Sequence, residues 1–227
     1  MIHLREILLR KGETQPATDF PFNLEVIRQW APLNFNAPVT VLVGENGSGK
    51  STILEGIACA AEMITIGSGP AHRDPTLAHV HDFAKWLKLV WNKRTRKGFF
   101  LRAEDFFGFV KHQAQSRIEM QRELARVDEE YKGRSRQAQN LARMPFAGQL
   151  GAMRERYGDG LDAQSHGESF LALFQSRFVP GGLYLLDEPE APLSPLRQMA
   201  LLSAIKEMAD QEAQFIIATH SPILMAY

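Results

Sequence analysis

The 227-residue sequence predicts an α/β fold with a central, mostly parallel sheet, an antiparallel β-hairpin region and an inserted helical lobe. Three apolar runs of strand length, at 39–43, 182–187 and 214–219, end in residues that can bind or react with a ligand. Unbroken apolar runs of this length are typical of parallel strands buried on both faces. One helix-length segment separates the last two runs, and such a strand–helix–strand unit is right-handed, so the three strands should end at one edge of the sheet.

The first part of the chain leads into the strand at 39–43. Residues 2–9 partly alternate and are rich in Ile and Leu, which predicts a first strand, and residues 23–30 form a shorter extended or helical piece. Pro38 bars the start of a helix and precedes the next strand. Apolar residues at helical spacing then predict an amphipathic helix that starts at Ser51.

The turn between that strand and helix has the sequence of a phosphate-binding loop. Gly44, four further residues and Gly49-Lys50-Ser51 match the pattern G-x-x-x-x-G-K-[ST] between a strand and a helix. The glycines let successive N–H groups point at a phosphate chain, and the helix N-terminus adds partial positive charge. Lys50 adds a charge at the β and γ phosphates, and the Ser51 hydroxyl can bind Mg²⁺. The predicted nucleotide-binding residues are Gly44, Glu45, Asn46, Gly47, Ser48, Gly49, Lys50, Ser51 and Thr52.

The middle of the chain contains a predicted β-hairpin and a helical insertion. Residues 86–91 and 98–103 have strand character and flank a basic tip, in which four of the five residues 93–97 are Lys or Arg. Such a tip either contacts nucleic-acid phosphates or is a solvated edge, and the second use is the commoner. Residues 111–144 are polar and helix-forming, with Gly133 as an interruption, and the Gly-containing stretch 145–164 reads as a connection. The sequence thus predicts one domain over 1–227 with a helical insertion at about 105–160, and not a long coiled coil, because heptads are not sustained.

Two adjacent carboxylates end the strand at 182–187. At the edge that carries the phosphate-binding loop, Asp187 would join the Mg²⁺ shell and Glu188 could accept a proton from the water that attacks the γ-phosphate. A helix is predicted from Pro195 to about Asp210, capped by Ser194. Its predicted core-facing residues are Leu196, Met199, Ala200, Leu202, Ile205 and Met208.

His220 follows the strand at 214–219. Because that strand is expected to lie parallel to the strand at 182–187, His220 would reach the γ-phosphate. A further motif, Ser165-His166-Gly167-Glu168, opens a helix over 170–178. Locally this is a capping box, and a glycine-containing helix N-terminus is also suited to bind an anion.

Composition excludes several classes of protein. Lys and Arg number 26, as do Asp and Glu, so no global basic charge argues for nucleic acid. Cys59 is the only cysteine, which excludes a disulfide framework or a cysteine-based zinc site. The charged N-terminus and the lack of a long apolar run predict a cytoplasmic protein.

Together these motifs resemble those of the ABC superfamily of ATPases. Residues 44–52 match its Walker A motif, 185–189 are similar to Walker B with the catalytic glutamate, and 165–168 resemble the signature motif. Residues 191–194 and 219–221 are similar to the D-loop and the switch histidine. The resemblance covers nearly the whole chain and is closest to small stand-alone bacterial ATPases, often classed as AAA-family but built like SMC and double-strand-break-repair heads.

The resemblance implies ATP and Mg²⁺ as ligands and a homodimer that sandwiches ATP. In that family the signature residues of one subunit contact the γ-phosphate bound by the other, so Ser165 and Gly167 would act in trans, within the stretch Ser165, His166, Gly167 and Glu168. The implied catalytic residues are Glu188, His220 and Lys50. The implied metal-binding residues are Ser51 and Asp187.

The sequence departs from the family pattern in four places. His166 stands where the family often has glycine, and Glu104 stands where a metal-binding glutamine is expected, which makes it a third candidate for the metal. The chain ends at Tyr227, where relatives continue. No aromatic residue is clearly marked for stacking on adenine; the candidates are Phe20, Phe22 and Phe35.

The leading functional prediction is an ATPase whose cycle opens and closes a homodimer and so drives or gates a partner. The alternative is an ATP-gated module that binds nucleic acid or a nuclease partner and hydrolyses ATP slowly. A transporter motor fits the superfamily but not its SMC-like branch. A small-molecule kinase would leave the carboxylate pair and the signature stretch without a role.

Overall fold

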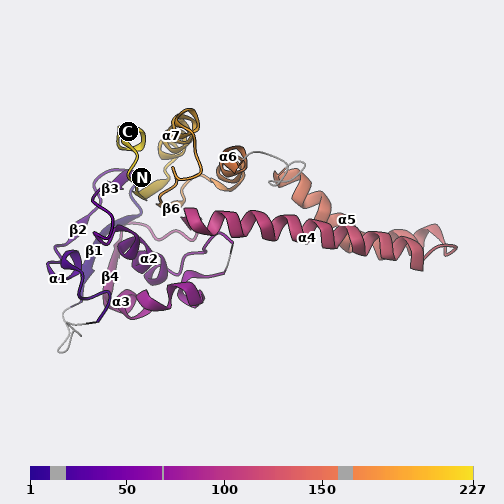
Figure 1. The fold of residues 1–227 in the computed structure, drawn as a ribbon, viewed down its shortest axis with the longest axis horizontal. Coiled ribbons are helices and arrows are strands. Elements are labelled where there is room, and N and C mark those ends of the chain that lie inside the picture. The colour runs from indigo at the N-terminus through magenta and orange to yellow at the C-terminus, as the bar shows by residue number, and fades with distance from the viewer. Residues whose placement is uncertain (11–18, 68, 158–165, 227) are drawn as a thin grey trace.

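A computed structural model describes residues 1–10, 19–67, 69–157 and 166–226 (Figure 1). It contains two sheets. The antiparallel sheet has the order β2-β1-β4, formed by Leu33–Asn34, Leu4–Leu9 and Leu87–Trp91. The parallel sheet has the order β3-β7-β6-β5, formed by Val39–Leu42, Gln214–Ala218, Leu183–Asp187 and Gly98–Arg102. The predicted α/β fold class with a parallel sheet is confirmed.

The hairpin expected over 86–103 does not form. β4 pairs antiparallel with β1, whereas β5 pairs parallel with β6, so the segment 92–97, with its four Lys and Arg residues, connects two different sheets. Burial explains the choice of partner: Phe99, Phe100 and Leu101 of β5 are all buried, which requires cover on both faces and therefore a place in the parallel sheet. The antiparallel region of the prediction exists as the three-stranded sheet.

β3 is less buried than its sequence suggests. All four of its residues are only partly buried, and Val43, just after the strand, is 61% exposed. Among the described strands β3 pairs only with β7, so it lies at an edge of the sheet. The expectation of burial on both faces was wrong for β3 and right for β6 and β7, whose residues are all buried.

Helices cover both faces of the parallel sheet. α2 (Lys50–Ala60) packs between the two sheets, in a core that also holds α1 (Glu25–Arg28) and α3 (His81–Trp86). The opposite face is covered by α6 (His166–Arg177), α7 (Pro195–Asp210) and α8 (Pro222–Met225). Two short 3₁₀ helices, η1 (Ala71–Arg73) and η2 (Pro75–Val80), follow α2. None of the helices in the described ranges combines the length and the apolar character that crossing a bilayer requires.

The core-facing side of α7 differs from the predicted one. Leu201, Ile205 and Ala209 are its buried residues, four positions apart, whereas Leu196 and Met199 are 78% and 58% exposed. Ala200 is also exposed, and Leu202 and Met208 are partly buried against the core. The predicted apolar side of α7 is thus buried or partly buried in its last turns and exposed at its start.

The insertion is a pair of long helices that projects from the body (Figure 1). α4 (Ala103–Glu130) and α5 (Arg136–Tyr157) pack along each other, and Gly133 lies in the turn between them with φ of 87°. The predicted connection at 145–164 is wrong for its first part, since Pro145, Gly148 and Gly151 lie inside α5. Packing against α4 compensates for the low helix propensity of these residues.

Candidate nucleotide-binding site

The glycine-rich loop between β3 and α2 turns through left-handed backbone. Gly47 and Gly49 have φ of 79° and 93°. A Cβ atom on Gly49 would lie 2.8 Å from the Val26 side chain, so both conformation and space require glycine there. Among the described residues no side chain caps the N-terminus of α2, which leaves N–H groups of its first turn for a ligand.

Lys50 lies across this loop. Its side chain is almost buried, and Nζ donates hydrogen bonds to the carbonyl oxygens of Gly44 at 2.8 Å and Glu45 at 2.9 Å. Within the described part of the chain these two carbonyl oxygens are the acceptors of the Lys50 ammonium group. Phosphate oxygens are stronger acceptors than carbonyl oxygens, so the loop suits a phosphate chain.

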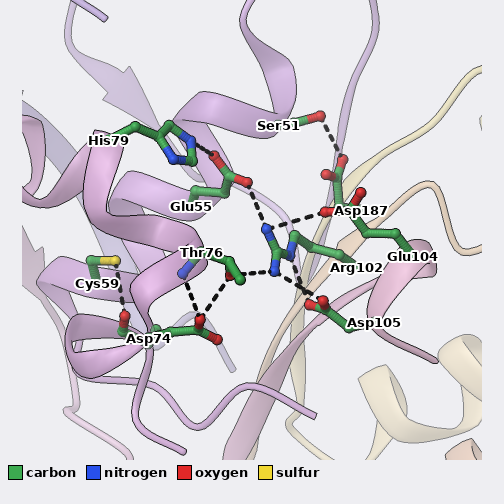
Figure 2. Close-up of polar contacts among 11 residues, drawn as sticks. Ser51, Glu55, Cys59, Asp74, Thr76, His79, Arg102, Glu104, Asp105 and Asp187 are labelled. Atoms are coloured by element: carbon green, nitrogen blue, oxygen red, sulfur yellow. Dashed lines mark hydrogen bonds and ion pairs between the residues drawn. The ribbon is translucent and has the colours of Figure 1, made fainter. Parts of the chain in front are cut away.

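Ser51 and Asp187 join the loop to the centre of the sheet. The Ser51 hydroxyl donates to Asp187 Oδ1 at 3.1 Å (Figure 2). Ser51 lies beyond β3 and Asp187 is the last residue of β6, and β7 separates these two strands. Burial raises the pKa of Asp187 to about 7, with Glu188 and Glu55 adding to the rise and the Ser51 hydrogen bond and Arg102 opposing it. Hydroxyl and carboxylate oxygens are the ligands that Mg²⁺ prefers, and a nearby cation would stabilise the buried carboxylate in its charged form. These two residues therefore fit a divalent cation.

Glu188 and His220 lie together at the carboxyl ends of β6 and β7. His220 Nε2 is 3.7 Å from Glu188 Oε1, and both side chains are partly exposed. Glu188 has φ of 48°, an uncommon conformation for a residue with a side chain. The two side chains line a cavity of about 350 Å³ together with Asn46, Gly47, Gly49, Lys50, Ser51 and Thr52. The structure therefore brings the loop, Glu188 and His220 around one cavity, with Asp187 beside Ser51.

Arg102, which no sequence motif singles out, organises the charges behind Asp187. Its guanidinium is buried and binds both carboxylate oxygens of Asp105, at 2.7 and 2.9 Å (Figure 2). It also donates to Thr76 at 2.8 Å and Glu55 at 3.3 Å. Glu104, the third metal candidate, is an exposed carboxylate 3.2 Å from Arg102 Nη1. Glu104 thus has an ion-pair partner, and its role at a metal stays a prediction.

Phe20 is the aromatic candidate that reaches the cavity. It is 48% exposed and lines the cavity beside the loop, together with Leu24. Phe22 and Phe35 are 5% and 1% exposed and belong to the hydrophobic core, so they cannot stack on a ligand. No sequence pattern separated the three, because only the path of the chain before α1 decides which ring faces the loop.

The signature stretch is only partly described. Ser165 and the side chain of His166 lie outside the described part of the chain. Gly167 is buried in the first turn of α6, where an added Cβ would lie 2.8 Å from the Arg197 side chain. Glu168 pairs with Arg197 Nη2 at 3.0 Å, which fixes the start of α6 against α7. Within the described ranges no group of three or more His, Cys, Asp or Glu side chains forms a separate metal site.

Two family models match parts of the chain. A family model described as AAA domain matches residues 23–144, and a second AAA-domain model, whose description also names the AbiEii toxin of a Type IV TA system, matches residues 169–226. The chain is 25% identical to the hemin import ATP-binding protein HmuV of Pseudomonas fluorescens, an alignment that covers 100% of the chain and 79% of the relative.

Among solved structures, the chain is similar to an SMC head domain from Pyrococcus furiosus that carries an extended coiled coil and is bound to the C-terminal domain of ScpA. The TM-score is 0.50 at 15% identity, over 100% of the chain and 92% of the head domain. An SMC head domain from Thermotoga maritima gives a TM-score of 0.45 at 15% identity, over 99% and 92% of the two chains. At such identities the likeness concerns the fold alone.

Proposed function

Because the chain belongs to the AAA-domain family, and is an ABC-superfamily ATPase that resembles SMC heads, we propose that it uses Mg²⁺ to hydrolyse ATP within a nucleotide-sandwiched homodimer. Opening and closing of that dimer would drive or gate a partner. The observation that carries the proposal is the Ser51–Asp187 hydrogen bond, which joins the phosphate loop to the strand that ends in Glu188. We also propose that the protein is located in the cytoplasm, because its proposed activity requires a supply of ATP.

The loop and α2 would bind the phosphates. Lys50 Nζ would exchange the Gly44 and Glu45 carbonyls for phosphate oxygens, and the free N–H groups of the loop would hold the chain of phosphates in line. Ser51 and Asp187 would hold Mg²⁺, with Glu104 as a third candidate. The ion, when bound, neutralises phosphate charge.

Glu188 and His220 would act on the γ-phosphate. The half-exposed Glu188 carboxylate faces the cavity and would accept the proton of the attacking water as the bond to the β–γ bridging oxygen breaks. His220, 3.7 Å away, would orient Glu188 and donate a hydrogen bond to a γ-phosphate oxygen. Phe20 would stack on the base, since its exposed ring lies beside the loop.

The second subunit would complete the site. Gly167 and Glu168 lie at the N-terminus of α6, and Ser165, outside the described residues, precedes them. In the proposed dimer this stretch would approach the γ-phosphate bound by the other subunit, where the partial positive charge of a helix N-terminus favours an anion.

The proposal is tested by the effect of Glu188→Gln on hydrolysis. The wild-type protein should release phosphate from ATP only with Mg²⁺, and Glu188→Gln should lower kcat about 100-fold or more while ATP still binds, because the amide cannot accept the proton. Glu207→Gln, a change on the exposed side of α7, is the matched control. Absence of Mg²⁺-dependent hydrolysis in the wild type, or full activity of Glu188→Gln, would contradict the proposal.

The alternative function, an ATP-gated module for nucleic acid, is favoured by the basic segment 93–97. Lys93, Arg94, Arg96 and Lys97 are all exposed, and only Arg94 has a carboxylate partner among the described residues, Glu62 at 3.8 Å. The segment lies at the amino ends of β5 and β6, at the edge of the sheet opposite the phosphate loop.

Charge reversal of this segment separates the two functions. Binding of single-stranded or duplex nucleic acid that weakens with salt and is lost when the four residues become Glu would support the alternative. Lack of binding even at low salt would leave the ATPase that acts on a protein partner.

A further inference from the structure

Glu190 holds together the two loops that carry Glu188 and His220. A single carboxylate oxygen, Oε1, accepts hydrogen bonds from the Thr219 hydroxyl at 2.6 Å, the His220 N–H at 2.7 Å and the Ser221 N–H at 3.1 Å. Three donors on one charged acceptor make a strong and directional contact. No other side chain of the described residues bonds to the backbone N–H of His220.

The contact lies at the carboxyl ends of the two central strands. β6 and β7 are in register at Asp187 and Ala218, and the Glu188 N–H donates to the Ala218 carbonyl at 2.9 Å. The chain then leaves both strands, and Glu190 reconnects the two paths two residues further on. Glu188 and His220 are therefore each fixed between a strand end and the Glu190 contact.

The His220 side of the contact has further support. The Ser221 hydroxyl accepts from the N–H groups of Ile223 and Leu224, at 3.2 and 3.3 Å, and donates to Gln198 of α7. This ties residues 219–221 to α7 and α8, so these residues are rigid on their far side. Glu190 supplies the corresponding restraint on the side that faces Glu188.

We infer that Glu190 is a positioning residue, which holds the backbone of residues 219–221 so that the His220 imidazole faces Glu188 across the nucleotide cavity. This inference rests on the proposed function, because Glu190 takes no part in the reaction itself and acts only by placing His220. Glu190 does not line the cavity; it acts through His220.

The second carboxylate oxygen gives a sharp control. Glu190 Oε2 is buried and has no hydrogen-bond partner within the described part of the chain. Glu190→Gln replaces this second oxygen by the NH₂ group of an amide and keeps an oxygen acceptor at the position of Oε1. Glu190→Ala removes the acceptor altogether. The glutamine variant thus tests whether the geometry of Oε1, rather than the presence of a side chain, positions His220.

The first experiment is hydrogen exchange of the nucleotide-free protein. Glu190→Ala should speed the exchange of the His220 amide by about tenfold or more, since its N–H loses its acceptor, and Glu190→Gln should recover most of the protection. The Ser221 amide should respond less, because it also donates to Thr219 Oγ1 at 2.9 Å. Amides of β6 should be unchanged in both variants, which shows that the fold is intact. Unchanged exchange at His220 in Glu190→Ala would overturn the inference.

The second experiment is a double-mutant cycle on ATP hydrolysis. Glu190→Ala should lower kcat nearly as much as His220→Ala, with KM for ATP changed less than about threefold, and adding Glu190→Ala to His220→Ala should cost little more. Thr219→Val, which removes one of three donors, should have a smaller effect.

The outcomes separate the inference from the function on which it rests. If Glu190→Ala and His220→Ala lower kcat independently, so that their effects multiply, Glu190 does not act through His220 and the inference is wrong. If Glu188→Gln hydrolyses ATP like the wild type, the proposed function itself fails, and the exchange experiment alone still decides whether Glu190 fixes residues 219–221.

Discussion

Asp187 illustrates how a single residue joins stability to function. Its carboxylate is almost removed from water and accepts one hydrogen bond from a side chain within the described residues, that of the Ser51 hydroxyl. Burial raises its pKa to about 7. A buried carboxylate of this kind is unfavourable in the nucleotide-free protein, and in the proposed function a bound cation would offset its cost. The cost of the site in the empty protein can therefore be measured.

Asp187→Asn should stabilise the nucleotide-free protein. Because the folded-state pKa of about 7 lies above the ordinary value of 3.8 for an aspartate, the folded protein binds this proton more tightly than the unfolded chain. Stability is therefore greatest below the unfolded pKa and falls as the pH rises through about 7. Asn removes this penalty, so the gain in free energy of unfolding should be larger at pH 8 than at pH 5 by about 1–3 kcal/mol.

Urea unfolding at the two pH values measures this difference. Glu188→Gln is the matched control, because the neighbouring Glu188 carboxylate is half-exposed and its replacement should change the stability less. A stability gain for Asp187→Asn that is equal at both pH values would show that Asp187 carries no raised pKa.

Arg102 stabilises the charges behind Asp187. Arg102→Met should lower the free energy of unfolding by about 3–5 kcal/mol, because it leaves Glu55 and Asp105 without their cation (Figure 2). Arg102→Lys should recover only part, since an ammonium cannot bind both oxygens of Asp105. Lys85→Met, which breaks the exposed pair with Asp82, should cost less than about 1 kcal/mol in the same thermal or urea unfolding.

At the level of elements, the local sequence pattern predicts where strands lie but not which strands pair with each other. β6 and β7 were predicted almost to the residue, because continuous apolar runs of this length favour strands buried on both faces. β4 and β5 were recognised as strands but assigned to each other, although each pairs elsewhere. Periodicity reports burial along one strand and contains no information about its neighbour.

Gly98 marks the start of the β5–β6 pairing and should not tolerate a side chain. It has φ of 114°, and a Cβ would lie 1.8 Å from the Leu183 carbonyl oxygen, which is backbone and cannot move aside. Gly98→Ala should therefore cost more than about 3 kcal/mol. Gly181→Ala, with φ of 70° but nothing within 4 Å, should cost only about 1 kcal/mol. Equal loss of stability in the two variants, measured by urea unfolding, would contradict this explanation.

At the level of the whole molecule, the proposed cycle requires two copies. Glu188→Gln with Mg²⁺ and ATP should move from the mass of one chain, 25.6 kDa, to that of two, because it traps bound nucleotide. Light scattering measures this shift. Ser165→Arg, outside the described residues, should abolish it by blocking the approach to the other subunit's phosphate. A protein that stays monomeric with saturating ATP would exclude the sandwich dimer and favour the binding module.

The sequence by itself determined the class of fold, the tight glycine-rich turn after β3 and the residues that end the central strands. These signals are local: a glycine pattern typical of a tight turn between a strand and a helix, and apolar runs typical of strands in a parallel sheet. For the same reason the candidate residues of the site could be chosen from the sequence alone: Lys50, Ser51, Asp187, Glu188 and His220.

Only the tertiary structure decided which distant residues meet. It joined Glu190 to residues 219–221, buried Arg102 among Glu55 and Asp105, brought Phe20 to the cavity and carried 92–97 from one sheet to the other. Each of these contacts links segments whose local sequences are unremarkable. Their positions follow from how the sheets and helices pack. The residues that a side chain contacts depend on the close packing of the whole core and not on its neighbours in the sequence.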